Sequence, residues 1–110
     1  MSEDTGWTRV AVLADFGPDR KLARRVGGLD LLLVKTGDTV LAVQNKCTHL
    51  GHALDRGRLM AGTITCPFHG ACFELRTGAA RSGPAVAPLT CYEARLREDH
   101  VDVRLPSTAA

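Results

Sequence analysis

Short hydrophobic runs separated by turn residues make up most of the chain, and no segment keeps the 3.6-residue spacing of a long amphipathic helix. Residues 91–97 alternate regularly, with Tyr92, Ala94 and Leu96 on one face and charged side chains on the other. Residues 100–105 alternate in the same way. Because alternation with a period of two places one face on a core, both runs are predicted to be half-buried antiparallel strands.

The same criteria predict further strands, and the complete set covers residues 7–16, 21–26, 29–35, 39–44, 62–66, 72–75, 91–97 and 100–105. Residues 29–35 are apolar on both faces, which indicates a central strand. The turn Gly37-Asp38 joins this run to the next one as a hairpin. The pattern therefore predicts an all-β, antiparallel sandwich or barrel, with one domain over 1–110, a core over 7–105 and a flexible tail at 106–110.

Composition excludes several classes of protein. The 110 residues suffice for one domain, and 45% hydrophobic with 24% charged residues is ordinary for a globular chain. No stretch is long and apolar enough to span a membrane, and the acidic start does not resemble a secretory signal, so we expect a cytoplasmic protein. The net charge of +2 is too small to indicate nucleic-acid binding. Residues 46–81 nevertheless carry a local surplus of three positive charges.

Candidate chemistry lies in two short motifs, Cys47-Thr48-His49-Leu50-Gly51-His52 and Cys66-Pro67-Phe68-His69-Gly70. Each offers one thiolate and one imidazole, which suit zinc or iron–sulfur chemistry rather than magnesium or calcium. Disulfides are the usual alternative for four cysteines, but a cytoplasmic location disfavours them. Structural zinc sites usually group Cys with Cys and His with His, so the mixed grouping disfavours zinc.

The spacing Cys-x-His-x₁₆-Cys-x-x-His resembles the Rieske [2Fe–2S] family, in which two histidines replace two cysteines on one iron. The residues Gly83-Pro84 are similar to the family's proline loop. The resemblance implies a Rieske-type antiparallel β-sandwich with a cluster-binding subdomain of two loops, over about residues 45–84. It also implies one [2Fe–2S] cluster per chain, with Cys47 and Cys66 as ligands of the inner iron and His49 and His69 as ligands of the outer iron.

The resemblance further implies a soluble, low-potential ferredoxin that passes single electrons from a flavoprotein NAD(P)H reductase to a terminal oxygenase. Both partners are expected to dock transiently at the cluster tip, and the chain itself is not expected to be an enzyme. Respiratory relatives have a membrane anchor and a disulfide between the cluster loops, whereas His52 and Phe68 occupy the matching positions here. The alternatives are the small subunit of an assimilatory nitrite reductase, a zinc-stabilised interaction module and a redox sensor.

Several residues near the motifs have no ligand role in this interpretation. His52 is expected to be a surface histidine, Cys72 a buried and inert thiol, and Cys91 a partly exposed thiol. High-potential relatives have a Ser and a Tyr that donate hydrogen bonds to the cluster, at the positions of Ala71 and Phe73. Since neither side chain here can donate, we expect a potential at the low end of the Rieske range.

Overall fold

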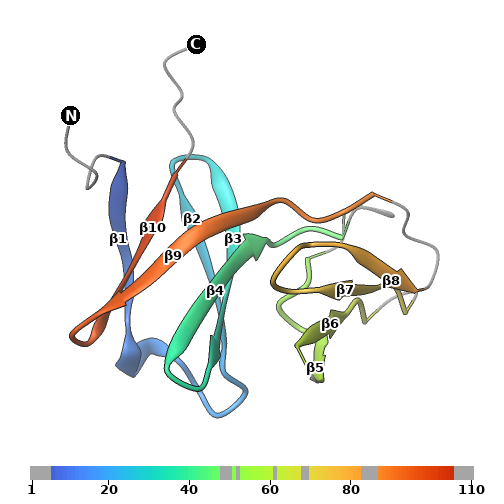
Figure 1. The fold of residues 1–110 in the computed structure, drawn as a ribbon, viewed down its shortest axis with the longest axis horizontal. Helices are drawn as coiled ribbons and strands as arrows, with labels where there is room; N and C mark the ends of the chain where they lie inside the picture. The colour runs from blue at the N-terminus through green and yellow to red at the C-terminus, as the bar shows by residue number, and fades with distance from the viewer. Residues whose placement is uncertain are drawn as a thin grey trace.

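The computed structural model describes residues 6–47, 51, 53–60, 62–67, 70–82 and 87–105, and within them the chain forms ten strands and one 3₁₀ turn. The strands are β1 (Trp7–Val12), β2 (Lys21–Val26), β3 (Leu29–Thr36), β4 (Thr39–Gln44), β5 (Arg58–Met60), β6 (Thr63–Thr65), β7 (Cys72–Glu74), β8 (Ala80–Ser82), β9 (Cys91–Arg97) and β10 (His100–Arg104). They form a six-stranded sheet, β1-β10-β9-β4-β3-β2, and a four-stranded sheet, β5-β6-β7-β8 (Figure 1). All pairs are antiparallel, so the expected all-β fold class is confirmed.

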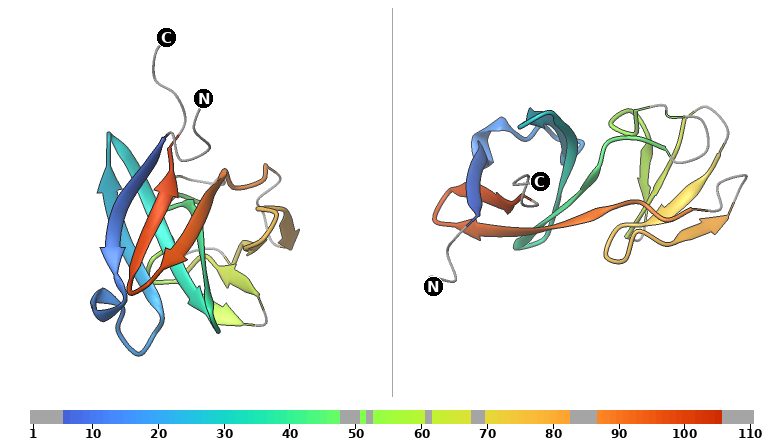
Figure 2. Two further views of the ribbon diagram at one scale, coloured as in Figure 1. Left: turned by 60° about the vertical axis from the view of Figure 1, so that its left-hand side comes forward. Right: turned by 90° about the horizontal axis from the view of Figure 1, so that it is seen from above.

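The six-stranded sheet curls strongly, so that its two edge strands come close together (Figure 2). Arg24 on β2 donates from Nε to the carbonyl oxygen of Val10 on β1 at 3.1 Å. This contact spans the gap between the edges and gives the sheet a barrel-like shape. Curling and partial closure also leave less exposed strand edge, which limits unwanted pairing with other chains.

Strand β3 separates two hydrophobic clusters. Leu31 and Leu33 belong to the cluster inside the curled sheet, whereas Leu32 and Val34 belong to a second cluster against the small sheet. All four are at most 1% exposed. The run of apolar residues on both faces therefore gives a strand buried on both faces, as the sequence predicts.

The small sheet consists of strands of only three residues each. Ile64 on β6 pairs with Phe73 on β7, and both are fully buried in the second cluster with Leu75 and Leu89. Leu89 also donates its N–H to the carbonyl of Gly78 at 2.7 Å. The segment before β9 thus fastens the small sheet to the large one (Figure 1).

The predicted strands agree best where alternation is regular. The ranges 21–26, 39–44 and 91–97 match β2, β4 and β9, and Tyr92, Ala94 and Leu96 pack inward as expected. The first strand is shorter than predicted, because β1 ends at Val12 and a 3₁₀ turn follows over Leu13–Asp15. Strands β5 and β8 are absent from the prediction.

Residues 83–84 and 106–110, expected to be a proline loop and a tail, lie outside the described residues. In the part of the chain that the structure describes, no helix has the length and apolar character needed to cross a membrane.

Candidate metal centre

The first motif begins just after β4 with a buried cysteine. Cys47 is 1% exposed, and its carbonyl oxygen accepts a hydrogen bond from the N–H of Gly51 at 2.8 Å. Gly51 has φ +80°, a left-handed conformation that glycine adopts without a steric penalty. The hydrogen bond therefore joins the two described ends of this segment, Cys47 and Gly51. His49 and His52 lie outside the described residues.

The second motif repeats this arrangement in the hairpin between β6 and β7. Cys66 is 2% exposed, and its carbonyl oxygen accepts from the N–H of Gly70 at 3.2 Å. Gly70 has φ +75°. The N–H of Cys66 donates to the carbonyl of Ala71 at 2.7 Å, which closes the base of the hairpin. His69 lies outside the described residues.

The two cysteines belong to one cluster of buried residues, together with Leu54, Ile64 and Phe73. Neither cysteine forms a disulfide. Two buried cysteines in two similar motifs fit an iron–sulfur cluster, because such clusters are held by thiolates and are tuned by burial and neighbouring amides. The four-ligand set itself stays a prediction, since its two histidines are not described.

The other two cysteines differ from this pair in burial. Cys72 begins β7 as expected, but it is half-buried and lines a surface groove, so the expectation of full burial is wrong. The reason is the alternation of β7, which places the neighbouring Phe73 in the core and Cys72 on the opposite face. Cys91 is on the exposed side of β9, as expected, and partial burial of its thiol raises its pKa above the ordinary value.

Asn45 fixes the segment after the first motif, a role that the sequence did not reveal. Its side-chain Oδ1 accepts from the N–H of Leu54 at 2.7 Å, and its Nδ2 donates to Asp55 at 3.3 Å. Leu54 is fully buried in the same cluster as the two cysteines. An Asn after a strand is common in turns, so only the fold distinguishes this one.

A second anchor lies at Gly57, which joins the segment after the first motif to both sheets. Lys21 on β2 donates from Nζ to the carbonyl oxygen of Gly57. A Cβ at position 57 would collide with the carbonyl oxygen of Thr65 on β6. This close approach requires glycine, but nothing in the sequence around Gly57 signals it.

The five cations of residues 46–81 are exposed, and four of them, the arginines, are divided between two grooves. Arg56 and Arg58 line a groove of about 510 Å³ that also includes Cys66, Cys72 and Met60, and we call it the β5 groove. Met60 is 60% exposed there. Arg76 and Arg81 instead line a different groove, described below. Of these two grooves, the β5 groove alone includes one of the predicted ligands that the structure describes, Cys66.

Two buried side chains next to the second motif lack hydrogen-bond donors. Ala71 follows the Gly70 turn and Phe73 lies at the centre of β7, and both are fully buried. Neither side chain can donate a hydrogen bond to a sulfur atom at this end of the small sheet.

Comparison with known proteins places the chain among iron–sulfur carriers. The family model described as "Rieske [2Fe-2S] domain" matches residues 6–93. Ferredoxin CarAc of Metapseudomonas resinovorans is 35% identical over 88% of this chain and 92% of its own length. The ferredoxin of carbazole 1,9a-dioxygenase from Nocardioides aromaticivorans IC177 has a TM-score of 0.83 at 34% identity, with 90% of this chain and 97% of that chain covered.

Two further structures bear on the alternatives. A complex of reduced oxygenase and oxidized ferredoxin in carbazole 1,9a-dioxygenase contains a chain 34% identical to this one, with a TM-score of 0.80 and coverage of 90% of this chain and 93% of that chain. A structure assigned as an NADPH nitrite reductase small subunit reaches a TM-score of 0.78 at 17% identity, over 88% and 96% of the two chains. That likeness shows the fold alone. The match to an iron–sulfur family does not support a zinc-stabilised module.

Replacing Asn45 by Ala tests the anchor after the first motif. The N–H of buried Leu54 loses its acceptor, which costs about 1–3 kcal/mol for an unsatisfied buried donor. We expect a melting temperature lower by about 4 °C or more, measured by far-UV circular dichroism. Thr63→Ala is the control, because it removes an exposed hydroxyl that donates to the carbonyl of Met60 and should have little effect. Equal melting temperatures for Asn45→Ala and the unmodified protein would contradict the assignment.

Proposed function

The chain belongs to the Rieske [2Fe–2S] domain family, and we propose that it is a ferredoxin carrying single electrons from a flavoprotein NAD(P)H reductase to a terminal oxygenase. Its relatives are ferredoxin components of dioxygenase systems, which are electron-transfer components rather than catalytic enzymes. The chain binds one Rieske-type cluster, which supplies one-electron redox chemistry. The observation that carries the proposal is the match to Ferredoxin CarAc along nearly the whole of both chains.

The proposed partners differ in their support. The similar ferredoxin in the carbazole 1,9a-dioxygenase complex is bound to its oxygenase, which favours an oxygenase as the acceptor for this chain as well. A reductase as the donor follows from the need to re-reduce a one-electron carrier after each transfer. We propose a flavoprotein fed by a nicotinamide for this step, because a flavin can accept a hydride and release single electrons.

We assign Cys47 and Cys66 to the inner iron and His49 and His69 to the outer iron. The two equivalent turns, each opened by a buried cysteine and closed by a glycine, support the pairing of one Cys and one His per loop. The role of the chain in this site is to hold the ligands, keep water away from the sulfurs and present the imidazoles to a partner.

The ligand assignment is tested by single substitutions. His49→Ala or His69→Ala should abolish the Rieske absorption and electron paramagnetic resonance spectra, because the outer iron loses half of its protein ligands. Cys47→Ser or Cys66→Ser should give mostly apoprotein, since a hydroxyl is a much poorer iron ligand than a thiolate.

Cys72→Ser and Cys91→Ser serve as matched controls, because both remove a free thiol outside the predicted ligand set. Each should retain iron and an unchanged spectrum. A Cys72→Ser protein that fails to assemble its cluster would contradict the assignment.

Electron flow from NADH through a flavoprotein reductase and this protein to a terminal oxygenase tests the function. Product formation should require the holoprotein and cease with Cys66→Ser.

Arg56 and Arg58 are exposed and line the groove that reaches Cys66, so we expect them to attract an acidic surface on a partner. The formally neutral oxidised cluster, with +6 from iron, −4 from sulfide and −2 from the two thiolates, leaves this positive charge uncompensated.

The transfer rate should therefore fall as salt screens the attraction, over the range where the Debye length shortens to about 10 Å or less. Arg56→Glu with Arg58→Glu should slow transfer at low salt and remove most of its salt dependence. Arg97→Glu reverses an exposed charge on β9 and is the control. Rates that are independent of salt, or insensitive to the Arg56 and Arg58 reversals, would exclude this docking mode.

The reduction potential should lie near the low end of the Rieske range, on the order of −150 mV. A donor to a sulfur stabilises the extra negative charge of the reduced cluster and raises the potential, and buried Ala71 and Phe73 supply none. Ala71→Ser with Phe73→Tyr should raise the midpoint by tens of millivolts or more in a spectroelectrochemical titration, on the scale over which hydrogen bonds tune such centres. A midpoint well above zero in the unmodified protein would argue against an oxygenase ferredoxin.

A further inference from the structure

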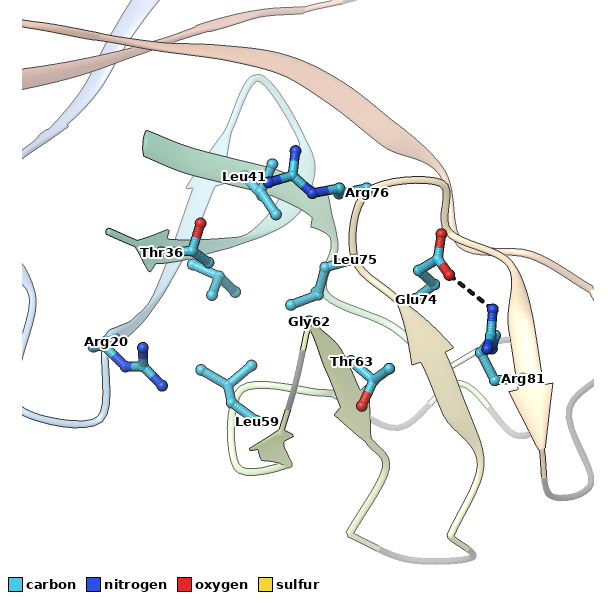
Figure 3. Close-up of a pocket in the computed structure, with 11 residues that line it drawn as sticks. Arg20, Thr36, Leu41, Leu59, Gly62, Thr63, Glu74, Leu75, Arg76 and Arg81 are labelled. Carbon is cyan, nitrogen blue, oxygen red and sulfur yellow. Dashed lines mark hydrogen bonds and ion pairs between the residues drawn. The ribbon is translucent and has the colours of Figure 1, made fainter. Parts of the chain in front are cut away.

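A second groove lies at the junction of the two sheets, and we call it the junction groove. Its volume is about 550 Å³, and its walls come from β3 and β4 of the large sheet and from β5, β6, β7 and β8 of the small one. Figure 3 shows Leu59 and Leu75 between Arg20 on the left and Arg81 on the right, with Arg76 and Leu41 above them. The groove is thus apolar at its centre and basic at its rim.

The rim carries three arginines and one carboxylate. Glu74 forms an ion pair with Arg81 at 2.9 Å, so this acidic group is already compensated. Arg20 and Arg76 are exposed, and within the described residues neither side chain makes a hydrogen bond or an ion pair. Two guanidinium groups are therefore available, and their planar donor geometry matches carboxylates well.

The backbone holds Arg20 in an unusual conformation. Its φ is +63°, in the left-handed region that costs a residue with a Cβ on the order of 1 kcal/mol. The N–H of Arg20 donates to Gly17 at 3.0 Å, and its carbonyl accepts from the N–H of Lys35 at 2.9 Å. A glycine would fit this turn without strain, which makes Arg20→Gly a variant that removes the side chain while favouring the same backbone.

The floor of the groove is apolar and close-packed. Val34 and Leu75 are at most 2% exposed, and the partly buried Leu41 and Leu59 pack against the same hydrophobic cluster. Gly62, at the turn between β5 and β6, is exposed, and a Cβ there would meet nothing within 4 Å. The groove is therefore open to a chain segment at this turn, rather than closed around a small molecule.

The junction groove lies away from the metal centre. Strand β6 runs from Gly62 and Thr63 at the groove toward Cys66, and β7 returns from Cys72 to Glu74. The groove residues Gly62, Thr63 and Glu74 thus lie at the other end of this hairpin from Cys66 and Cys72. A molecule in this groove would leave the turn that holds Cys66 uncovered.

We propose that the junction groove binds an acidic segment of a protein partner, with carboxylates on Arg20 and Arg76 and a leucine-like side chain on the apolar floor. Exposed cations around an apolar centre are complementary to alternating acidic and apolar residues. The contact would add to docking at the metal centre without competing for it. The proposal does not depend on the identity of the electron donor or acceptor.

The probe is a fluorescein-labelled pentapeptide, Asp-Glu-Leu-Asp-Glu, titrated with the oxidised holoprotein at low salt and followed by fluorescence anisotropy. Arg20→Gly and Arg76→Gln should each weaken binding about three- to tenfold, the range for losing a charge-assisted hydrogen bond at a partly exposed site. Arg20→Gly should melt at the same temperature as the unmodified protein or higher, so that weaker binding is not a result of unfolding. Amide resonances of Gly62 and Thr36 should shift in ¹⁵N spectra.

Three controls decide the outcome. Arg97→Gln removes an exposed charge elsewhere on the large sheet and should leave binding unchanged. The amide peptide Asn-Gln-Leu-Asn-Gln should bind at least tenfold more weakly. The peptide Asp-Glu-Ser-Asp-Glu should also bind more weakly, because it lacks the leucine that would contact the apolar floor. The proposal is wrong if Arg58→Gln weakens binding while Arg20→Gly does not, because the peptide then occupies the β5 groove. It is also wrong if inorganic phosphate displaces the peptide completely at low concentration, or if the amide peptide binds equally well.

Discussion

The hydrophobic cluster shared by the two sheets is the contact on which the small sheet depends. Four strands of three residues cannot form a stable sheet alone, because so few ladder hydrogen bonds and so little burial do not offset the loss of chain entropy. Leu32 and Val34 of β3 and Val43 of β4 supply the surface against which Ile64 and Phe73 pack. Strand β3 can do this because its other face serves the core of the large sheet.

The same cluster explains how the two proposed sulfur ligands come to share one environment. Cys47 and Cys66 come from different sheets, since one follows β4 and the other follows β6, yet both are buried in this cluster. The packing of the chain itself therefore places both thiols in one apolar environment. Because a binding site formed by tertiary packing is absent from the unfolded chain, metal binding and folding stabilise each other.

The sequence predicts the large sheet better than the small one for a physical reason. Strands β2, β4 and β9 have six or seven residues, enough for alternation and turn signals to define both ends. Strand β5 has three residues, Arg58 to Met60, and two of them are exposed, so no alternation is visible. Strand β8 is equally short. Such strands form because neighbours distant in the sequence supply their hydrogen-bond partners.

The candidate site shows the same division between local and distant information. The cysteine and glycine positions of the two turns are visible in the sequence, because residue type and spacing carry their chemistry. The roles of Asn45 and Gly57 are not visible in the sequence, because they depend on tertiary contacts. Asn45 contacts Leu54 and Asp55. Gly57 accepts a hydrogen bond from Lys21 and lies close to Thr65. The predicted burial of Cys72 is wrong because a shift of one position along a short strand moves a side chain to the opposite face.

The order of the small sheet determines how its positive charge can be used. Arg58 is on β5 and Arg81 on β8, and these strands form opposite edges of the sheet. The surplus of positive charge over residues 46–81 is continuous in the sequence but separated in space. Of the two grooves, only the β5 groove reaches Cys66. Arg20, which is distant in sequence, joins Arg76 and Arg81 at the junction groove instead. The two basic regions thus line two different grooves, which meet at Thr63. Under the proposed docking mode, Arg56 and Arg58, with exposed Lys46 beside Cys47, supply the positive charge near the two cysteines, and the basic rim of the junction groove is left for a separate contact.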